Sequence, residues 1–306
     1  GNTYVMKLFS PEKLYKHFIR DNYDIIISYL EGPTARIVSG CTNPNTKLVS
    51  WIHIEQHTKE LASKSFRSYK EALDCYSKFD RTVCVSDTVK DDFESIFDTK
   101  KSVEVLYNTN ESEKIKKLSD EKVDDVNFSK DTINIISVAK IVPSKGYDRL
   151  MKIHKKLIEK NIKNHIYILG IGEEKEKYEK YLAENNLTDT FTFLGYRDNP
   201  YKYVKKADLY VCSSRREGFS TAVTEALIVG TPVVSTNCSG AYELLGKNNE
   251  YGIVTENNED ALYEGIKKML TTPDLLEAYA AKAKERGKAF STEKTVKTVE
   301  EMLSAL

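Results

Sequence analysis

Long apolar runs are missing from this sequence. No uninterrupted stretch approaches the ~20 apolar residues that a membrane-spanning helix needs, and no basic stretch followed by an apolar segment opens it, as in a secretory signal. Net charge is missing too, because 46 lysines and arginines balance 46 aspartates and glutamates. Without a whole-molecule field we expect no nucleic-acid partner, and any anion site must be local.

Cysteine is scarce and unpatterned. The five cysteines include no CxxC pair, and none has a histidine partner at the spacing of a zinc site. We therefore expect buried free thiols, a cytoplasmic location and no zinc site. A DxD-like metal motif is also missing at the strand ends, so no metal is expected. The chain does contain 40% apolar and 30% charged residues over a length of 306. This combination is typical of a globular protein with two domains.

Short apolar runs alternate with helix-like stretches along most of the chain. The first part predicts strands at 25–29, 48–52, 83–86 and 103–107, and helices at 10–21, 33–40, 58–79 and 88–97. The second part predicts strands at 133–138, 165–170, 191–194, 208–212, 232–236 and 252–254, and helices at 146–160, 173–185, 199–205, 221–229, 241–245 and 257–270. Two further helices are expected after Pro273. This alternation predicts an α/β protein with parallel sheets covered on both faces.

A charge-rich, apolar-poor stretch at 111–132 separates the two alternating parts and is the expected domain boundary. We predict an N-terminal Rossmann-like domain over residues 1–127 and a doubly wound C-terminal domain over residues 128–290. A final helix over residues 291–306 is expected to pack back on the N-terminal domain.

The stretch from Arg215 to Leu227 is the most informative part of the sequence. It directly follows a predicted strand, turns at Gly218 and begins a helix near Ser220. Ligands of open α/β sheets sit at such strand ends, and the free amides of a helix N-terminus favour phosphate. Glu217 and Glu225 flank this point and could grip two parts of an elongated ligand. They could equally do no more than complement the helix dipole.

Two lysines follow the first strand of the second domain. Lys140 and Lys145 lie in a loop after that strand, and Gly146 opens the next helix. Two ammonium groups beside a helix N-terminus suit a diphosphate, although in a lysine-rich protein they could also be plain solvated side chains. Gly170 and Gly172 repeat the pattern of strand, glycine turn and helix, which alone is weak evidence.

Together these motifs resemble the retaining glycosyltransferases of family 4, which have the GT-B fold of two Rossmann-like domains facing a cleft. The resemblance covers the chain from about Asp24 onward and is strongest in the EGF…EAL..GTPVV pattern of Glu217 to Val234. It looks most like the bacterial branch that builds surface polysaccharides. It implies a nucleotide-sugar donor, with a UDP-sugar expected, and a glycan or lipid-linked acceptor.

The resemblance also implies roles for individual residues. Glu217 and Lys145 would be catalytic. Glu217 would contact the hydroxyl groups of the donor sugar, and Glu225 would bind the ribose. Lys140 stands where the family usually has arginine, and with Lys145 it would bind the diphosphate without a metal or other cofactor. The remaining donor-binding residues would be Gly170, Arg197 near the base, Gly218, Phe219, Ser220 and Thr221.

In the N-terminal domain His53 ends a predicted strand and resembles the family's active-site histidine; His57 is the weaker candidate. Glu31 and Gly32 would line the acceptor side with His53. The chain enters this domain after the strand, glycine-rich loop and helix that usually begin the family, so we expect the domain to be partial.

The predicted helix at 10–21 is basic. Its Lys13, Lys16 and Arg20 could touch lipid headgroups at the inner face of the plasma membrane, or could form a solvated face.

Two alternatives stay open. A non-catalytic glycosyltransferase-like subunit would bind a partner or glycan, and the lysine at 140 is compatible with it. A nucleotide-sugar epimerase or a phosphorylase on the same scaffold would need its own acid–base carboxylates or a cofactor lysine, and no clear set is present.

Overall fold

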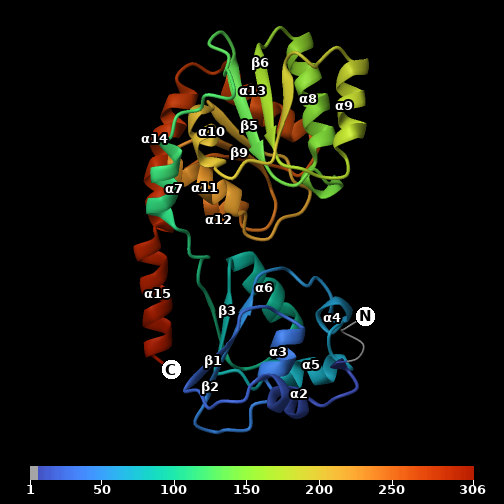
Figure 1. Cartoon of the computed structure of the whole chain (residues 1–306), viewed down its shortest axis with the longest axis vertical. Coiled ribbons are helices and arrows are strands. Elements are labelled where there is room, and N and C mark those ends of the chain that lie inside the picture. The colour runs from blue at the N-terminus through green and yellow to red at the C-terminus, as the bar shows by residue number, and fades with distance from the viewer. Residues whose placement is uncertain (1–5) are drawn as a thin grey trace. The chain divides into compact units, whose positions relative to one another are not determined.

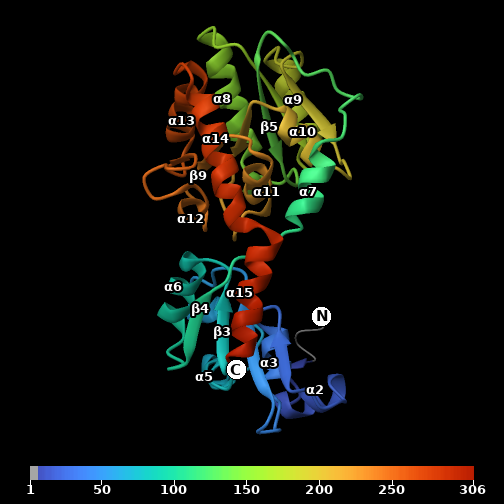
Figure 2. The ribbon, with the colours of Figure 1, turned by 90° about the vertical axis from the view of Figure 1, so that its left-hand side faces the viewer.

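The computed structural model describes residues 6–306 and divides into two compact units, each described by itself. The first unit comprises the chain up to Asn108 together with Val296–Leu306, and the second comprises Thr109–Thr295. Both are α/β units built on a parallel sheet (Figures 1 and 2). No helix among residues 6–306 combines the length and apolar character that crossing a bilayer requires.

The first unit has a four-stranded sheet in the order β1-β2-β3-β4. Its strands are parallel, so each carboxyl end lies at the same edge. The aromatic rings of Phe66, Tyr76, Phe79 and Phe93 are fully buried beside it. The elements, in chain order, are α2 (Pro11–Phe18), β1 (Ile25–Ser28), α3 (Pro33–Val38), β2 (Lys47–Ile52), α4 (Lys59–Ala62), α5 (Tyr69–Tyr76), β3 (Arg81–Cys84), α6 (Asp87–Ile96) and β4 (Ser102–Val105).

The second unit has a six-stranded parallel sheet in the order β10-β9-β8-β5-β6-β7. Its elements are α7 (Ser112–Ser119), β5 (Ile133–Val138), η1 (Pro143–Lys145), α8 (Tyr147–Glu159), β6 (Asn164–Leu169), α9 (Lys175–Glu184), β7 (Phe191–Gly195), α10 (Tyr201–Lys206), β8 (Leu209–Cys212), α11 (Thr221–Val229), β9 (Val233–Thr236), α12 (Ala241–Leu245), β10 (Ile253–Thr255), α13 (Glu259–Thr271), α14 (Leu275–Gly287) and η2 (Lys288–Phe290). The last helix, α15 (Thr292–Ser304), runs from this unit into the first.

Helices cover both faces of the larger sheet (Figure 1). Helices α8, α9 and α13 bury their apolar faces in a core with Ile135, Ile166 and Leu209 of the strands. On the other side α10, α11 and α14 pack together. The α/β fold class predicted from the sequence is therefore confirmed.

One local prediction is wrong, and one helix is not predicted. The single helix expected at 58–79 is two helices, α4 and α5, because Phe66 turns into the core and Ser68 caps a new helix by accepting from the amide of Glu71 at 3.1 Å. The charge-rich stretch at 111–132 contains α7, which packs on α10 and α11. Only Ile115 gives α7 a buried large apolar side chain, so its helical pattern is weak.

Candidate functional site

A cavity of about 270 Å³ lies at the carboxyl ends of β5 and β8. These two strands are neighbours, and the strand order runs outward from them in opposite directions, so the loops that follow them diverge and leave a crevice. The cavity brings together Lys140, Lys145, Glu217, Ser220 and Thr221 of the predicted donor site. Its other walls are Ser137, Val138, Ala139, Tyr147, Tyr210, Cys212, Ser214 and Ala222.

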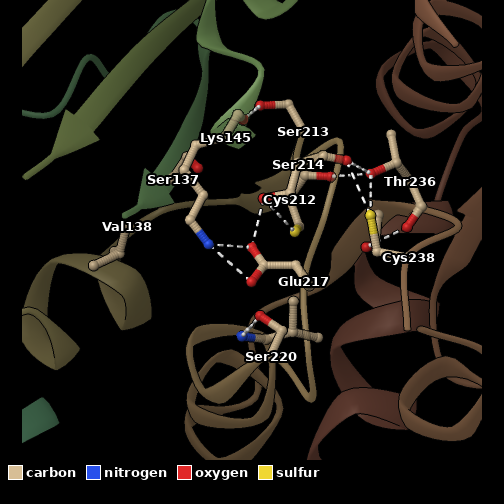
Figure 3. A network of polar contacts seen from close by, with 12 residues as sticks. Ser137, Val138, Lys145, Cys212, Ser213, Ser214, Glu217, Ser220, Thr236 and Cys238 are labelled. Carbon is tan, nitrogen blue, oxygen red and sulfur yellow. Dashed lines mark hydrogen bonds and ion pairs between the residues drawn. The ribbon is translucent and has the colours of Figure 1, made fainter. Parts of the chain in front are cut away.

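An ion pair joins the two loops at this cavity (Figure 3). Lys145 Nζ donates to both carboxylate oxygens of Glu217, at 2.7 and 2.8 Å. The hydroxyl of Ser214 donates to Glu217 Oε1 at 2.5 Å. The side chains of Lys145 and Glu217 are only 23% and 15% exposed, so little water competes with this pair and its geometry is well held.

The N-terminus of α11 points its free amides toward the same place. The first intrahelical hydrogen bond is donated by Thr224 N to Ser220 O at 3.1 Å, so the amides of Thr221 and Ala222 precede the ladder. Ser220 caps the helix by accepting from Val223 N at 3.4 Å. Lys140 is exposed, and no hydrogen bond or ion pair of its ammonium group is found within residues 6–306. A local region of positive potential therefore faces the cavity.

Glu225 lies one turn into α11, outside the lining of the cavity. Tyr201 OH donates to its Oε1 at 3.4 Å. Burial raises the pKa of Glu225 to about 7, because the charged carboxylate loses hydration that one long hydrogen bond does not replace.

The other predicted donor-site residues also lie outside the cavity lining. Gly170 has a φ of 149°, and a Cβ there would lie 1.9 Å from the carbonyl oxygen of Ala139, so this close approach of two loops requires glycine. Arg197 pairs with Asp125, its Nε donating to Oδ2 at 3.1 Å. The ring of Phe219 is buried, so only its backbone is expected to contact a ligand. Gly218 precedes it in the same loop.

Sequence reasoning missed the polar network behind Glu217. Arg149, on α8, donates to the carbonyl oxygens of Ser213 and Ser214. The side chain of Thr236, the last residue of β9, also donates to Ser214 O, at 2.6 Å. Arg149 could have been found from the sequence, because it is a charged residue on the face of α8 that is otherwise buried and mostly apolar.

The predicted acceptor-side residues lie together in the first unit. The amide of His53, after β2, donates to Glu31 Oε2 at 3.0 Å, and Glu31 follows β1. The amide of Gly32 donates to Tyr76 OH at 3.1 Å. The Nε2 atom of His53 is buried and has no hydrogen-bond partner within residues 6–306, and the ring packs edge-on against Tyr29.

His57 belongs to a separate cluster. Potential ligand atoms of Glu55, His57 and Asp92 lie within 4.8 Å of one another. Asp92 already accepts from the backbone amides of Gln56 and His57, at 2.6 and 3.0 Å. His57 has a φ of 63°, so this carboxylate stabilises a strained turn, which accounts for the cluster without an ion.

Solved structures identify the fold class. The structure of Anabaena Alr3699/HepE in complex with UDP matches 97% of this chain and 81% of that chain, with a TM-score of 0.75 and 16% sequence identity. At this identity the likeness concerns the fold, and it confirms the GT-B architecture of two Rossmann-like domains.

Sequence comparisons identify the family. The family model for glycosyl transferases group 1 matches residues 119–286. The chain is 31% identical, over 89% of its length and 70% of the relative's, to the N-acetylgalactosamine-N,N'-diacetylbacillosaminyl-diphospho-undecaprenol 4-alpha-N-acetylgalactosaminyltransferase of Campylobacter jejuni. It is 25% identical, over 93% of its length and 55% of the relative's, to the poly(ribitol-phosphate) alpha-N-acetylglucosaminyltransferase of Staphylococcus aureus. The chain belongs to the group 1 glycosyltransferases and is a transferase.

Proposed function

We propose that this enzyme transfers a hexosyl unit, plain or N-acetylated, from a UDP-sugar to a hydroxyl group of a bacterial surface glycan, with retention at the anomeric carbon. The observation that carries the proposal is the Lys145–Glu217 pair beside the free amides of α11, in one cavity at the strand-order reversal. Cations and helix amides suit a diphosphate, and a carboxylate suits sugar hydroxyls.

The reaction breaks the bond between the anomeric carbon and the diphosphate oxygen and forms a bond from that carbon to the acceptor oxygen. The bonding electrons leave with UDP, and the acceptor's hydroxyl proton passes to the departing phosphate oxygen on the same face of the sugar. Negative charge therefore grows on the diphosphate in the transition state. Lys140, Lys145 and the amides of Ser220 and Thr221 would oppose that charge, so no metal or other cofactor is required.

Glu217 would exchange partners when the donor binds. Without donor its carboxylate accepts from Lys145 and Ser214. Sugar hydroxyls would take over part of this acceptor capacity, and the ammonium group of Lys145 would then be shared with the diphosphate. Glu225, deeper along α11, would accept from the ribose hydroxyls, and the backbone near Arg197 would meet the base.

Retention is supported by the names of two relatives, which specify alpha-linked products. The usual UDP-hexose donors carry the sugar in an alpha linkage, so an alpha product keeps the configuration. No carboxylate in the donor cavity other than Glu217 is available as a covalent nucleophile within the described residues, which favours departure and attack on one face.

The acceptor is proposed to be a glycan carried on a lipid or a polymer, in line with the undecaprenol and poly(ribitol-phosphate) in the relatives' names. His53, Glu31 and Gly32 would line its side. The protein would work in the cytoplasm, with peripheral contact at the membrane. Four exposed residues lie in and just after α2: the basic Lys13, Lys16 and Arg20, and the apolar Phe18. Such a combination suits anionic headgroups.

A panel of UDP-, GDP- and ADP-sugars tests the proposal by calorimetric binding and by release of the nucleoside diphosphate in the presence of a polyprenyl diphosphate-linked glycan. We expect binding and turnover with a UDP-hexose or UDP-N-acetylhexosamine. Binding of UDP without turnover of any donor would favour the non-catalytic subunit. Absence of any nucleotide binding would contradict the donor site itself.

A further inference from the structure

A buried arginine stands directly behind the loop that carries Glu217. Arg149, on α8, is only 4% exposed. Its Nε and Nη2 donate to Ser213 O at 2.9 and 2.6 Å, and Nη2 also donates to Ser214 O at 2.6 Å. Asn257 Oδ1 accepts from the same nitrogen at 2.8 Å. All hydrogen-bond acceptors of Arg149 are thus uncharged oxygens, two from the backbone of the Glu217 loop and one from the side chain of Asn257.

Within residues 6–306 no carboxylate forms an ion pair with this guanidinium, although the charge of Asp148 acts on it. The adjacent Asp148 is taken by Arg215, whose Nη1 and Nη2 donate to its two oxygens at 2.7 and 2.8 Å. Burial, and secondly the charge of Arg215, lower the pKa of Arg149. Burying an unpaired charge costs free energy. If Arg149 served only the stability of the fold, a neutral side chain at this position would serve it better.

The loop that Arg149 holds is fixed from several directions. Ser214 O accepts from Arg149, from Thr236 Oγ1 at 2.6 Å and from Cys238 Sγ at 3.1 Å. Ser213 Oγ donates to the carbonyl oxygen of Lys145 at 2.9 Å. With the Ser213 and Ser214 backbone held in this way, the Ser214 hydroxyl is aimed at Glu217 (Figure 3).

We propose that Arg149 is a positioning residue for the transferase reaction: it holds the backbone of Ser213 and Ser214 so that Ser214 and Lys145 present Glu217 to the donor sugar. This role rests on the proposed function of Glu217. Arginine suits it because its planar fork reaches two successive carbonyl groups and an amide oxygen at once, which the single ammonium group of lysine does not.

Hydrogen–deuterium exchange tests the structural half of the proposal on the ligand-free protein. The amide of Arg215 donates to Ser144 O at 2.7 Å, so it reports whether the loop is held. In Arg149→Lys we expect exchange of residues 213–217 to accelerate at least about tenfold while the cores of both sheets exchange as before. Thr236→Val, which removes one other donor to Ser214 O, should give a smaller acceleration. Unchanged loop exchange in Arg149→Lys would overturn the proposal.

A double-mutant cycle tests the functional half. If Arg149 acts through Ser214, Arg149→Lys should lower kcat at least about tenfold and change the Kd for UDP by less than about threefold. In a protein that already carries Ser214→Ala, adding Arg149→Lys should lower kcat by less than about a further twofold. A merely structural residue would give effects that multiply. Arg36→Lys, at the other fully buried arginine, is the matched control, and its effect should multiply with that of Ser214→Ala.

The two proposals can fail separately. If the wild-type protein binds no nucleoside diphosphate and releases none from any donor, the proposed function fails, whereas the exchange experiment still decides whether Arg149 holds the loop. If the wild type is active and the effects of Arg149→Lys and Ser214→Ala multiply, the positioning role fails and the function stands.

Discussion

Glu217 and His53, which follow strands of the second and the first unit, differ in how their polar groups are satisfied. In the second unit Glu217 has three hydrogen bonds from Lys145 and Ser214. In the first unit the ring nitrogens Trp51 Nε1 and His53 Nε2 are buried without a hydrogen-bond partner within the described residues. Since buried polar atoms are nearly always satisfied, Glu217 is held by the protein's own contacts, whereas the two ring nitrogens have hydrogen-bonding capacity left.

The largest effect is expected at Glu217, whose carboxylate has its hydrogen-bond partners within the protein. Glu217→Gln keeps the size of the side chain but removes the charge that pairs with Lys145 and that, in the proposed function, the sugar hydroxyls would recognise. We expect transfer to fall about 100- to 1,000-fold, with UDP affinity changed little, as measured by kcat/KM and calorimetry. Glu173→Gln, an exposed position in the same unit, is the control. Full activity of Glu217→Gln would refute the assignment.

The second effect sharpens the comparison of the two buried arginines. Arg36, unlike Arg149, is paired with a carboxylate: its Nη2 and Nε donate to Glu71 at 2.9 and 3.2 Å. Glu71→Gln would leave a fully buried charge uncompensated. We expect the first unit to lose about 3 kcal/mol of stability, seen as an earlier unfolding transition in calorimetry, while UDP affinity stays unchanged.

If Glu71→Gln left the unfolding of the first unit unchanged, Arg36 would not depend on its ion pair. Its donations to the carbonyl oxygens of Met6 and Phe9 would then suffice, and the two arginines would be equivalent.

The sequence predicts the secondary structure of the second unit closely, because its strands are apolar and its helices have clear starts. Ser220, for example, begins α11 where the pattern places it. It also predicts that the loops after β5 and β8 carry chemistry. It does not predict that Lys145 and Glu217 pair, since they are 72 residues apart and only the neighbouring positions of β5 and β8 bring them together.

The residues that support the site are harder to find from sequence. Arg149 and Asn257 lie 108 residues apart and meet only through the packing of the loops. Helix α7 is missed because its sequence is almost entirely polar, and its contacts with α10 and α11 supply the stability that its pattern lacks. Local patterns thus predict which segments form, whereas long-range contacts decide what holds Glu217.

A smaller effect on transfer is expected at His53. His53→Ala removes the buried Nε2 atom that has no partner and should reduce transfer about tenfold through kcat or the acceptor KM, with the Kd for UDP unchanged. His57→Ala is the matched control, since His57 lies in the separate cluster with Asp92, and it should leave both constants near wild type. A change in UDP affinity in His53→Ala would contradict the division of roles.

The last effect concerns Glu225 and the pH dependence of stability, with no change in activity at issue. Burial raises its pKa to about 7, above the value of 4.5 of an ordinary glutamate carboxyl group. As pH rises from about 4.5 to about 7, the unfolded chain therefore loses this proton before the folded protein does, and the free energy of unfolding falls. Below that window both states are protonated, and above it the penalty is constant. Glu225→Gln should remove a decrease of about 2 to 3 kcal/mol between pH 5 and pH 8, measured by urea unfolding of the second unit. Glu173→Gln should retain the wild-type slope, and an unchanged slope in Glu225→Gln would mean that this carboxylate is hydrated in the folded protein and free to titrate as in water.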